Sequence, residues 1–288
     1  MFIGIIEPME RRFLPIGIQD FEKLRKGNYV YVDKTSYVYE LAQLSTPYFL
    51  SRPRRFGKSL LLSTFEAYFR GKKDLFKGLA IEQLEKDWAE YPVIKISFGA
   101  NSYENNERLK SRFETILTQN ENQFNIERKS DDPAERLNNI IHSAYEKTGN
   151  QVVILIDEYD KPILDALYTE YEELNRQELR SFYSPLKDCD EYIRFLFITG
   201  ITKISHVNIF SGLNQLDDIS LEKAYATLCG ISESELEQYF EPEIKALAQE
   251  QEMTVEETKK KLARMYDGYH FTHNAEGVYN PLDRKSVV

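Results

Sequence analysis

The stretch Ser51-Arg52-Pro53-Arg54-Arg55-Phe56-Gly57-Lys58-Ser59 decides the fold of this chain. It follows an apolar run at residues 48–50 and precedes a helical pattern at residues 58–69, which predicts a loop between a strand and a helix. Such a loop aims backbone N–H groups at one point, and the helix dipole adds positive potential there. Because Gly-Lys-Ser also ends the pattern G-x-x-x-x-G-K-[ST], the stretch predicts a phosphate site in an α/β protein.

One position departs from that pattern, because Arg52 stands where the first glycine is expected. The loop must therefore turn differently, and Pro53 can fix part of the turn. Arg54 and Arg55 supply cationic donors close to the expected phosphates. Gly-Lys-Ser alone is weak support, since the tripeptide is common and usually just begins a helix. The assignment of a phosphate site therefore depends on further motifs in the chain.

A second motif favours the phosphate interpretation. The β-branched run at residues 152–156 ends in Asp157 and Glu158, at the strand end where open α/β sheets bind ligands. Lys58 would then bind the β- and γ-phosphates, and Ser59 and Asp157 would hold Mg²⁺. Glu158 would activate the attacking water as a general base. The alternative is that these acids merely begin a helix, where the dipole favours them.

The remaining pattern alternates short apolar runs with longer helical stretches, which predicts a parallel sheet with helices on both faces. Thr199 ends one of the strands, where it would either sense the γ-phosphate or satisfy its own backbone. A long helical region is expected up to about residue 188. The further strands are expected at residues 93–98 and 193–198, and the further helices at residues 33–44, 107–119 and 133–147.

The composition changes near residue 220, which predicts a core at residues 1–220 and a smaller, truncated helical part at residues 221–288. Residues 232–257 hold nine Glu and one Lys. Ser232 with Glu235 fits a capping box, and Pro242 and Thr254 are expected to begin further helices. The stretch 269–279 predicts a hairpin or wing, a simpler explanation of its two histidines, His270 and His273, than a metal pair.

The charge and cysteine content exclude several classes of protein. The 288 residues carry 37 basic and 47 acidic side chains, a net charge of −10, so no protein-wide positive field can hold nucleic acid or an anionic membrane. Cys189 and Cys229 have no partners at metal-ligand spacing and suggest neither a disulfide framework nor a zinc site. No run is long enough for a membrane span, and no export signal is readable. We expect a cytoplasmic protein.

Five motifs resemble those of the bacterial AAA-ATPase-like proteins, at residues 15–21, 31–35, 52–59, 156–162 and 210–214. The resemblance covers about residues 13–281 and implies a P-loop NTPase core of the AAA+/ASCE type, followed by a helical and winged-helix-like part. An arginine at the first-glycine position is usual in that family, so Arg52 is a family variant. AAA-like proteins commonly place adenine contacts just before the phosphate loop, which makes Tyr31 a candidate, unless its segment is only a strand and a helix cap.

Members of that family often continue into a C-terminal nuclease-like domain of the PD-(D/E)xK type. No nuclease motif is readable here, so we expect that the chain stops short of such a domain, while Met9 is a candidate alternative start. The first functional hypothesis is an ATP-binding, Mg²⁺-dependent ATPase, with a homo-oligomer as a possible partner arrangement. The alternative is a nucleotide switch that turns over slowly or not at all and controls a C-terminal effector or another protein. DNA handling is a third hypothesis, which the acidic balance opposes.

Overall fold

A five-stranded parallel sheet forms the centre of the computed structural model, which describes residues 13–99, 101–203, 209–210, 213, 216–266 and 268–281. The strands lie in the order β2-β3-β4-β1-β5. Their bounds are β1 Tyr48–Ser51, β2 Val93–Ser97, β3 Val152–Asp157, β4 Ile193–Gly200 and β5 Asp217–Asp218. The strand β4 thus lies between the strand that leads into the phosphate loop and the strand that ends in Asp157.

The strand β3 is buried on both faces, as its apolar run predicts. Val153 and Leu155 pack in one hydrophobic cluster, and Val152, Ile154 and Ile156 pack in the other. Each of these five side chains is at most 2% exposed. The two clusters hold the two helical layers on opposite faces of the sheet.

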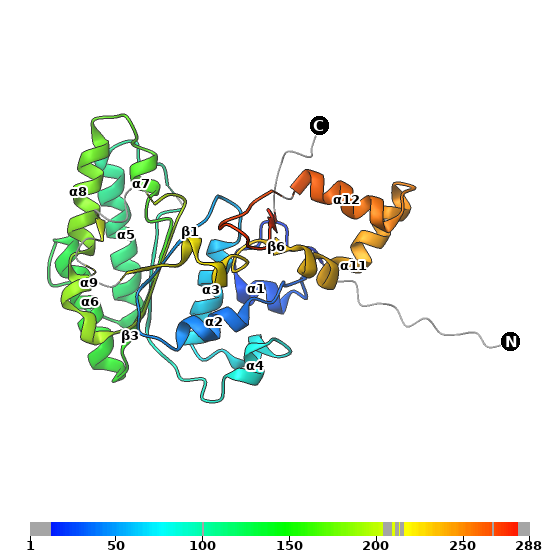
Figure 1. Cartoon of the computed structure of the whole chain (residues 1–288). Coiled ribbons are helices and arrows are strands. Elements are labelled where there is room, and N and C mark those ends of the chain that lie inside the picture. Colours follow the sequence, from blue (N-terminus) through cyan, green and yellow to red (C-terminus); the bar gives the residue numbers. More distant parts are fainter. Residues whose placement is uncertain are drawn as a thin grey trace.

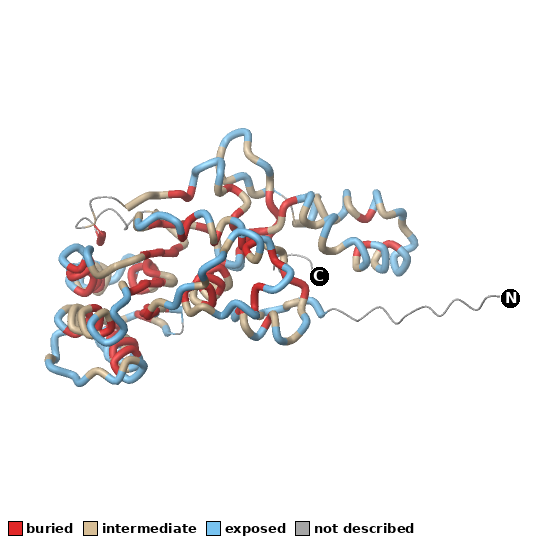
Figure 2. Tube along the Cα trace, turned by 90° about the horizontal axis from the view of Figure 1, so that it is seen from below, coloured by how far each residue is buried: buried red, intermediate tan, exposed pale blue. Residues whose placement is uncertain are grey.

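Helices cover both faces of the sheet, which confirms the expected mixed α/β architecture (Figure 1). One layer contains α1 (Phe21–Lys26), α2 (Thr35–Ala42), α3 (Lys58–Phe69) and α4 (Ile81–Leu84). The other contains α5 (Asn106–Phe124), α6 (Pro133–Thr148), α7 (Lys161–Leu164), α8 (Tyr171–Tyr183) and α9 (Pro185–Asp188). Short 3₁₀ helices occur at Lys73–Phe76, Asp190–Tyr192, Ile219–Leu221 and Lys223–Tyr225. In Figure 2, buried segments of the trace lie mainly where these layers meet.

Two helical expectations need correction. The helix expected at residues 107–119 continues as α5 to Phe124, because a left-handed residue, Asn125, ends it only there. The long helical region before residue 188 is divided into α7, α8 and α9. Tyr168 has a φ of +64°, a conformation that no helix interior accepts, and it lies between the first two of these helices.

The C-terminal part contains β6 (Ile231–Ser232), α11 (Glu233–Glu250), α12 (Val255–Tyr266) and β7 (Val278–Tyr279). The capping box of Ser232 and Glu235 is present at the start of α11. The expectation that Pro242 begins a helix is wrong, because Pro242 lies inside α11. The helix continues beyond it, where Ile244 and Ala248 are buried, and their packing outweighs the one missing N–H bond.

Residues 269–279 contain an antiparallel bridge, in which the Val278 N–H donates to the Tyr269 carbonyl at 3.0 Å. The strand β7 also pairs antiparallel with β6. These contacts agree with the expected hairpin, while the winged-helix assignment stays a prediction. Residues 211, 212 and 214 of the fifth motif, Met9 and the final residues 283–288 lie outside the described residues. Among the described helices, none has the length and apolarity that crossing a membrane requires.

Candidate functional site

The loop between β1 and α3 is shaped by two residues with left-handed backbone. Arg55 has a φ of +71° and Gly57 a φ of +92°. A Cβ atom on Gly57 would meet nothing within 4 Å, so glycine is favoured there by its backbone angle and not by lack of space. The first helical bond of α3 runs from the Leu61 N–H to the Gly57 carbonyl at 2.9 Å. The earlier N–H groups of this twelve-residue helix are left for the loop and for a ligand.

The Lys58 ammonium lies inside this loop. Its Nζ donates to the carbonyl oxygens of Arg52 at 2.8 Å and Pro53 at 2.9 Å, and the residue is 6% exposed. Burial lowers the pKa of Lys58, and its attraction to nearby acids such as Asp157 and Glu158 partly offsets this effect. The loop carbonyls thus hold the Lys58 ammonium in place at the start of α3.

Two hydroxyls meet on the Asp157 carboxylate. The Ser59 Oγ donates to one carboxylate oxygen at 2.6 Å, and the Thr199 Oγ1 donates to the other at 2.7 Å. Three elements, α3, β3 and β4, thus bring together three residues that the sequence singled out. Thr199 is fully buried, and its hydroxyl is directed at Asp157.

These oxygen atoms suit Mg²⁺. Magnesium takes hard oxygen ligands, usually one or two from protein, and completes its shell with water and substrate phosphates. Ser59 and Asp157 can supply these one or two protein ligands beside the phosphate loop. Among the described residues, no group of three or more His, Cys, Asp or Glu is placed to hold a metal ion.

Glu158 follows Asp157 and has a φ of +53°, a strained conformation for this residue type that is typical of functional sites. Its carboxylate lies over Gly99, where an added Cβ would come within 3.2 Å of Glu158 Oε2. Burial, and next the charge of Asp157, raise the pKa of Glu158. A half-buried carboxylate with a raised pKa has the properties of a general base.

Two loop residues of the candidate ATP site, Arg52 and Phe56, direct their side chains away from the expected phosphates, so any contact they make with ATP would come from their backbone. The Arg52 guanidinium is 1% exposed and donates to the carbonyls of Ser220 at 2.7 Å and Tyr225 at 2.9 Å. Phe56 is also 1% exposed, and its ring packs edge-on against Phe271 with centroids 5.3 Å apart. Both side chains point into the C-terminal part because apolar and carbonyl groups are available there and water is not.

The Tyr31 side chain is also directed into the protein interior. Its ring is 9% exposed and packs edge-on against Phe21, with centroids 5.1 Å apart. Its neighbour Asp33 accepts bonds from the Thr35 N–H at 2.8 Å and the Ala80 N–H at 2.7 Å. Asp33 thus binds N–H groups at the starts of α2 and α4, and Tyr31 packs in the hydrophobic core, while its assignment as an adenine contact stays a prediction.

Arg54 and Arg55 remain at the exposed tip of the loop. The charge of Arg54 acts on the carboxylate of Glu158 and lowers its pKa slightly against the dominant effect of burial. Both arginines are placed where they could meet a nucleotide.

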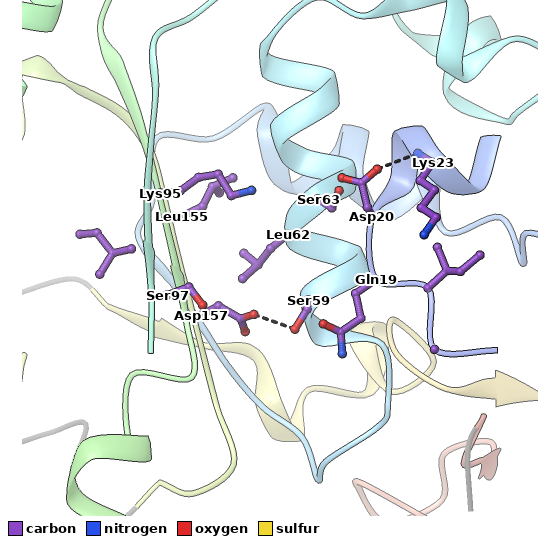
Figure 3. A pocket seen from close by; sticks show the side chains of 13 residues that line it. Gln19, Asp20, Lys23, Ser59, Leu62, Ser63, Lys95, Ser97, Leu155 and Asp157 are labelled. Atoms are coloured by element: carbon purple, nitrogen blue, oxygen red, sulfur yellow. Dashed lines mark hydrogen bonds between the residues drawn. The ribbon is translucent and has the colours of Figure 1, made fainter. Parts of the chain in front are cut away.

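A cavity of about 350 Å³ lies beside the Ser59–Asp157 pair (Figure 3). The N-terminal segment around Gln19 forms one wall, and Lys95 and Ser97 of β2 lie on the other side. The sequence marks residues 15–21 as one of the family-like motifs but predicts no role for them. No local signal could have placed it here, because the contact depends on the packing of α1 against α3.

The described site lies within the part of the chain that matches known proteins. Residues 15–210 match the family described as predicted AAA-ATPase. The chain is 42% identical over 278 residues to an "uncharacterized protein in vnfD 5′ region" of Azotobacter chroococcum mcd 1. That alignment covers 96% of this chain and 51% of the relative, so the chain spans about half the length of that protein. No solved structure gives a significant match. On the extent of the family match, the chain belongs to the predicted AAA-ATPase family.

Proposed function

We propose that this chain binds ATP with Mg²⁺ at the loop of residues 52–59 and hydrolyses it to ADP and phosphate. The observation that carries the proposal is the pair of hydroxyl bonds from Ser59 and Thr199 to Asp157, a carboxylate close enough for its charge to act on the Lys58 ammonium. Family membership supports nucleotide binding. Lys58 and the first N–H groups of α3 would bind the β- and γ-phosphates.

The two adjacent carboxylates, Asp157 and Glu158, would have different roles. Asp157 accepts hydroxyl bonds at both oxygens, which fixes the orientation of its carboxylate and suits the holding of a metal with Ser59. When bound, Mg²⁺ would offset the negative charge on the phosphates. Glu158, whose pKa is raised, would take a proton from the attacking water. Arg54 and Arg55 would add positive charge at the exposed side.

The test is Mg²⁺-dependent ATP hydrolysis by the full chain beside its Glu158→Gln and Lys58→Ala variants, with ATP binding measured in each. We expect Glu158→Gln to bind ATP and to lose turnover by roughly a hundredfold or more, because the amide cannot accept the proton. Lys58→Ala should lose binding. Glu127→Gln is the matched control, since Glu127 is exposed and follows the far end of α5. Normal turnover in Glu158→Gln would remove Glu158 from the chemical step.

A second candidate function is a nucleotide switch that controls the C-terminal part or an effector joined to it. The contacts of Arg52 and Phe56 with residues 220–271 favour it, because they tie the phosphate loop directly to that part. The relative is about twice as long as this chain. ATP binding with no turnover in the unaltered chain would favour the switch over the ATPase.

A further inference from the structure

The cavity beside Ser59 and Asp157 lies on the side where metal-bound water would collect. Both residues line it, together with Gln19, Lys95 and Ser97. Magnesium keeps several of its waters when it binds to protein, and those waters need hydrogen-bond partners. The question is which wall of the cavity can supply such a partner.

The N-terminal wall is held in place on both sides of Gln19. Gly17 turns the chain with a φ of +75°, and the Ile18 N–H donates to the Pro15 carbonyl at 3.2 Å. The Asp20 carboxylate caps α1 by accepting from the Lys23 N–H at 2.6 Å. The backbone between these two anchors therefore has little freedom.

The next residue fixes this segment against α3. Phe21 is fully buried in the core, and its N–H donates to the Ser63 Oγ at 2.9 Å. Ser63 lies one helical turn after Ser59, on the same face of α3. Gln19 precedes Phe21 by two residues and thus lies alongside Ser59, and Figure 3 shows its amide group directed toward Ser59.

Several other polar groups of the cavity are already engaged, among them the Ser97 Oγ, which accepts from the Gly99 N–H at 3.4 Å. The Lys95 ammonium pairs with Glu66 at 2.6 Å, and a cation is in any case a poor neighbour for a metal ion. The Asp20 carboxylate is used in capping α1. The Gln19 amide is exposed and makes no hydrogen bond with any of the described residues. An amide oxygen can accept from a metal-bound water without adding charge to the site.

We propose that Gln19 is a positioning residue for the metal, which holds a Mg²⁺-bound water through its side-chain amide. This inference rests on the proposed function and deepens it. It assigns the N-terminal motif at residues 15–21 the task of closing the metal side of the nucleotide site. The partners that support metal ligands in this way typically change metal affinity by ten- to a hundredfold when they are removed.

The experiment is the binding of a fluorescent ATP analogue to the full chain, titrated with Mg²⁺, for the unaltered chain and for Gln19→Ala. We expect the Mg²⁺ concentration for half-maximal binding to rise roughly tenfold in Gln19→Ala, while affinity in EDTA stays unchanged. Gln19→Glu keeps an acceptor oxygen and should restore the Mg²⁺ response. The matched control is Gln43→Ala, since Gln43 caps the far end of α2 and bonds to the Tyr39 carbonyl.

The outcomes separate this inference from the function on which it rests. If the unaltered chain responds to Mg²⁺ and Gln19→Ala responds identically, the role of Gln19 is refuted and the nucleotide site stands. An equal loss of affinity with and without Mg²⁺ would also refute it, because that pattern indicates a structural defect. If the unaltered chain binds no nucleotide, the proposed function fails and the inference fails with it.

Discussion

Asp160 is a fully buried carboxylate that holds the backbone just after Thr199. Its Oδ2 accepts from the N–H groups of Ile201 at 2.8 Å and Thr202 at 2.7 Å, while its Oδ1 has no partner. Burial raises the pKa of Asp160 despite these bonds. We predict that Asp160→Asn is at least as stable as the unaltered chain at pH 7.5, because the amide oxygen keeps the acceptor role and removes a buried charge.

The sign of the pH dependence follows from that raised pKa. Above the folded-state pKa the buried charge opposes folding, and this penalty disappears as the pH falls below the unfolded-state value. The stability advantage of Asp160→Asn should therefore shrink from pH 7.5 toward pH 4.5, measured as the difference in urea unfolding free energy. Asp160→Ala is the contrasting variant, and it should lose about 1–3 kcal/mol for each N–H left unpaired. An advantage that grows at low pH would contradict the argument.

At the scale of residues, the sequence predicted the backbone placement of the site better than the direction of long side chains. Lys58, Ser59 and Asp157 stand where the strand, loop and helix pattern puts them. The Arg52 guanidinium instead bonds to the Ser220 carbonyl, 168 positions away in the chain. Such a partner leaves no trace in the local pattern, and so the motif that located the loop could not predict the direction of this side chain.

Among the elements, α11 is attached to the core through its first turn. The Lys34 Nζ donates to both carboxylate oxygens of Glu235, at 2.5 and 2.6 Å, and to the Thr227 carbonyl at 2.6 Å. The Lys34 and Glu235 side chains are only 10% and 18% exposed. We predict that Glu235→Gln lowers the free energy of unfolding by about 3 kcal/mol, because it leaves a buried ammonium without its counter-charge. Glutamine still completes the capping box, so the capping contribution is retained.

The controls for this prediction are a second pair and a double variant. Lys245 and Glu241 form an i,i+4 pair on the same helix, with side chains 58% and 64% exposed, and Glu241→Gln should change stability by less than about 0.5 kcal/mol. Lys34→Met combined with Glu235→Gln should recover much of the loss, since no buried charge then remains. If Glu235→Gln and Glu241→Gln change the free energy of chemical unfolding equally, the buried pair contributes no more to stability than the exposed one.

The elements themselves were predictable to different degrees. The strands β2, β3 and β4 follow from apolar, β-branched runs that only a buried strand accepts, and their observed ends lie within two residues of the expected ones. Helix interiors were predictable, but their ends depended on single residues such as Tyr168 and Asn125, whose left-handed backbone no periodicity reports. The sequence predicted a helix start at Pro242 because proline is unfavourable inside a helix. The burial of Ile244 and Ala248 beyond it stabilises the continuous helix, and this burial is not visible in the local sequence.

Over the whole molecule, the phosphate loop and the C-terminal part meet at Phe271. The Arg52 guanidinium lies over the Phe271 ring at 4.0 Å, and the Phe56 ring packs edge-on against it. The loop is also joined to this part by the bond from the Gly230 N–H to the Phe56 carbonyl at 3.1 Å. Because both side chains come from the loop, whatever changes the loop changes the packing of Phe271.

This contact predicts coupling between ATP binding and the C-terminal part. Phe271→Ala removes the ring on which Arg52 and Phe56 rest, so the loop should lose its preformed shape and the dissociation constant for ATP should rise by roughly fivefold or more. By reciprocity, ATP should slow hydrogen exchange at residues 269–279 in the unaltered chain. Tyr168→Ala is the control, since that aromatic side chain is 97% exposed. Two results together would contradict this coupling. They are normal ATP binding by a folded Phe271→Ala variant, and hydrogen exchange at residues 269–279 of the unaltered chain that does not change with ATP.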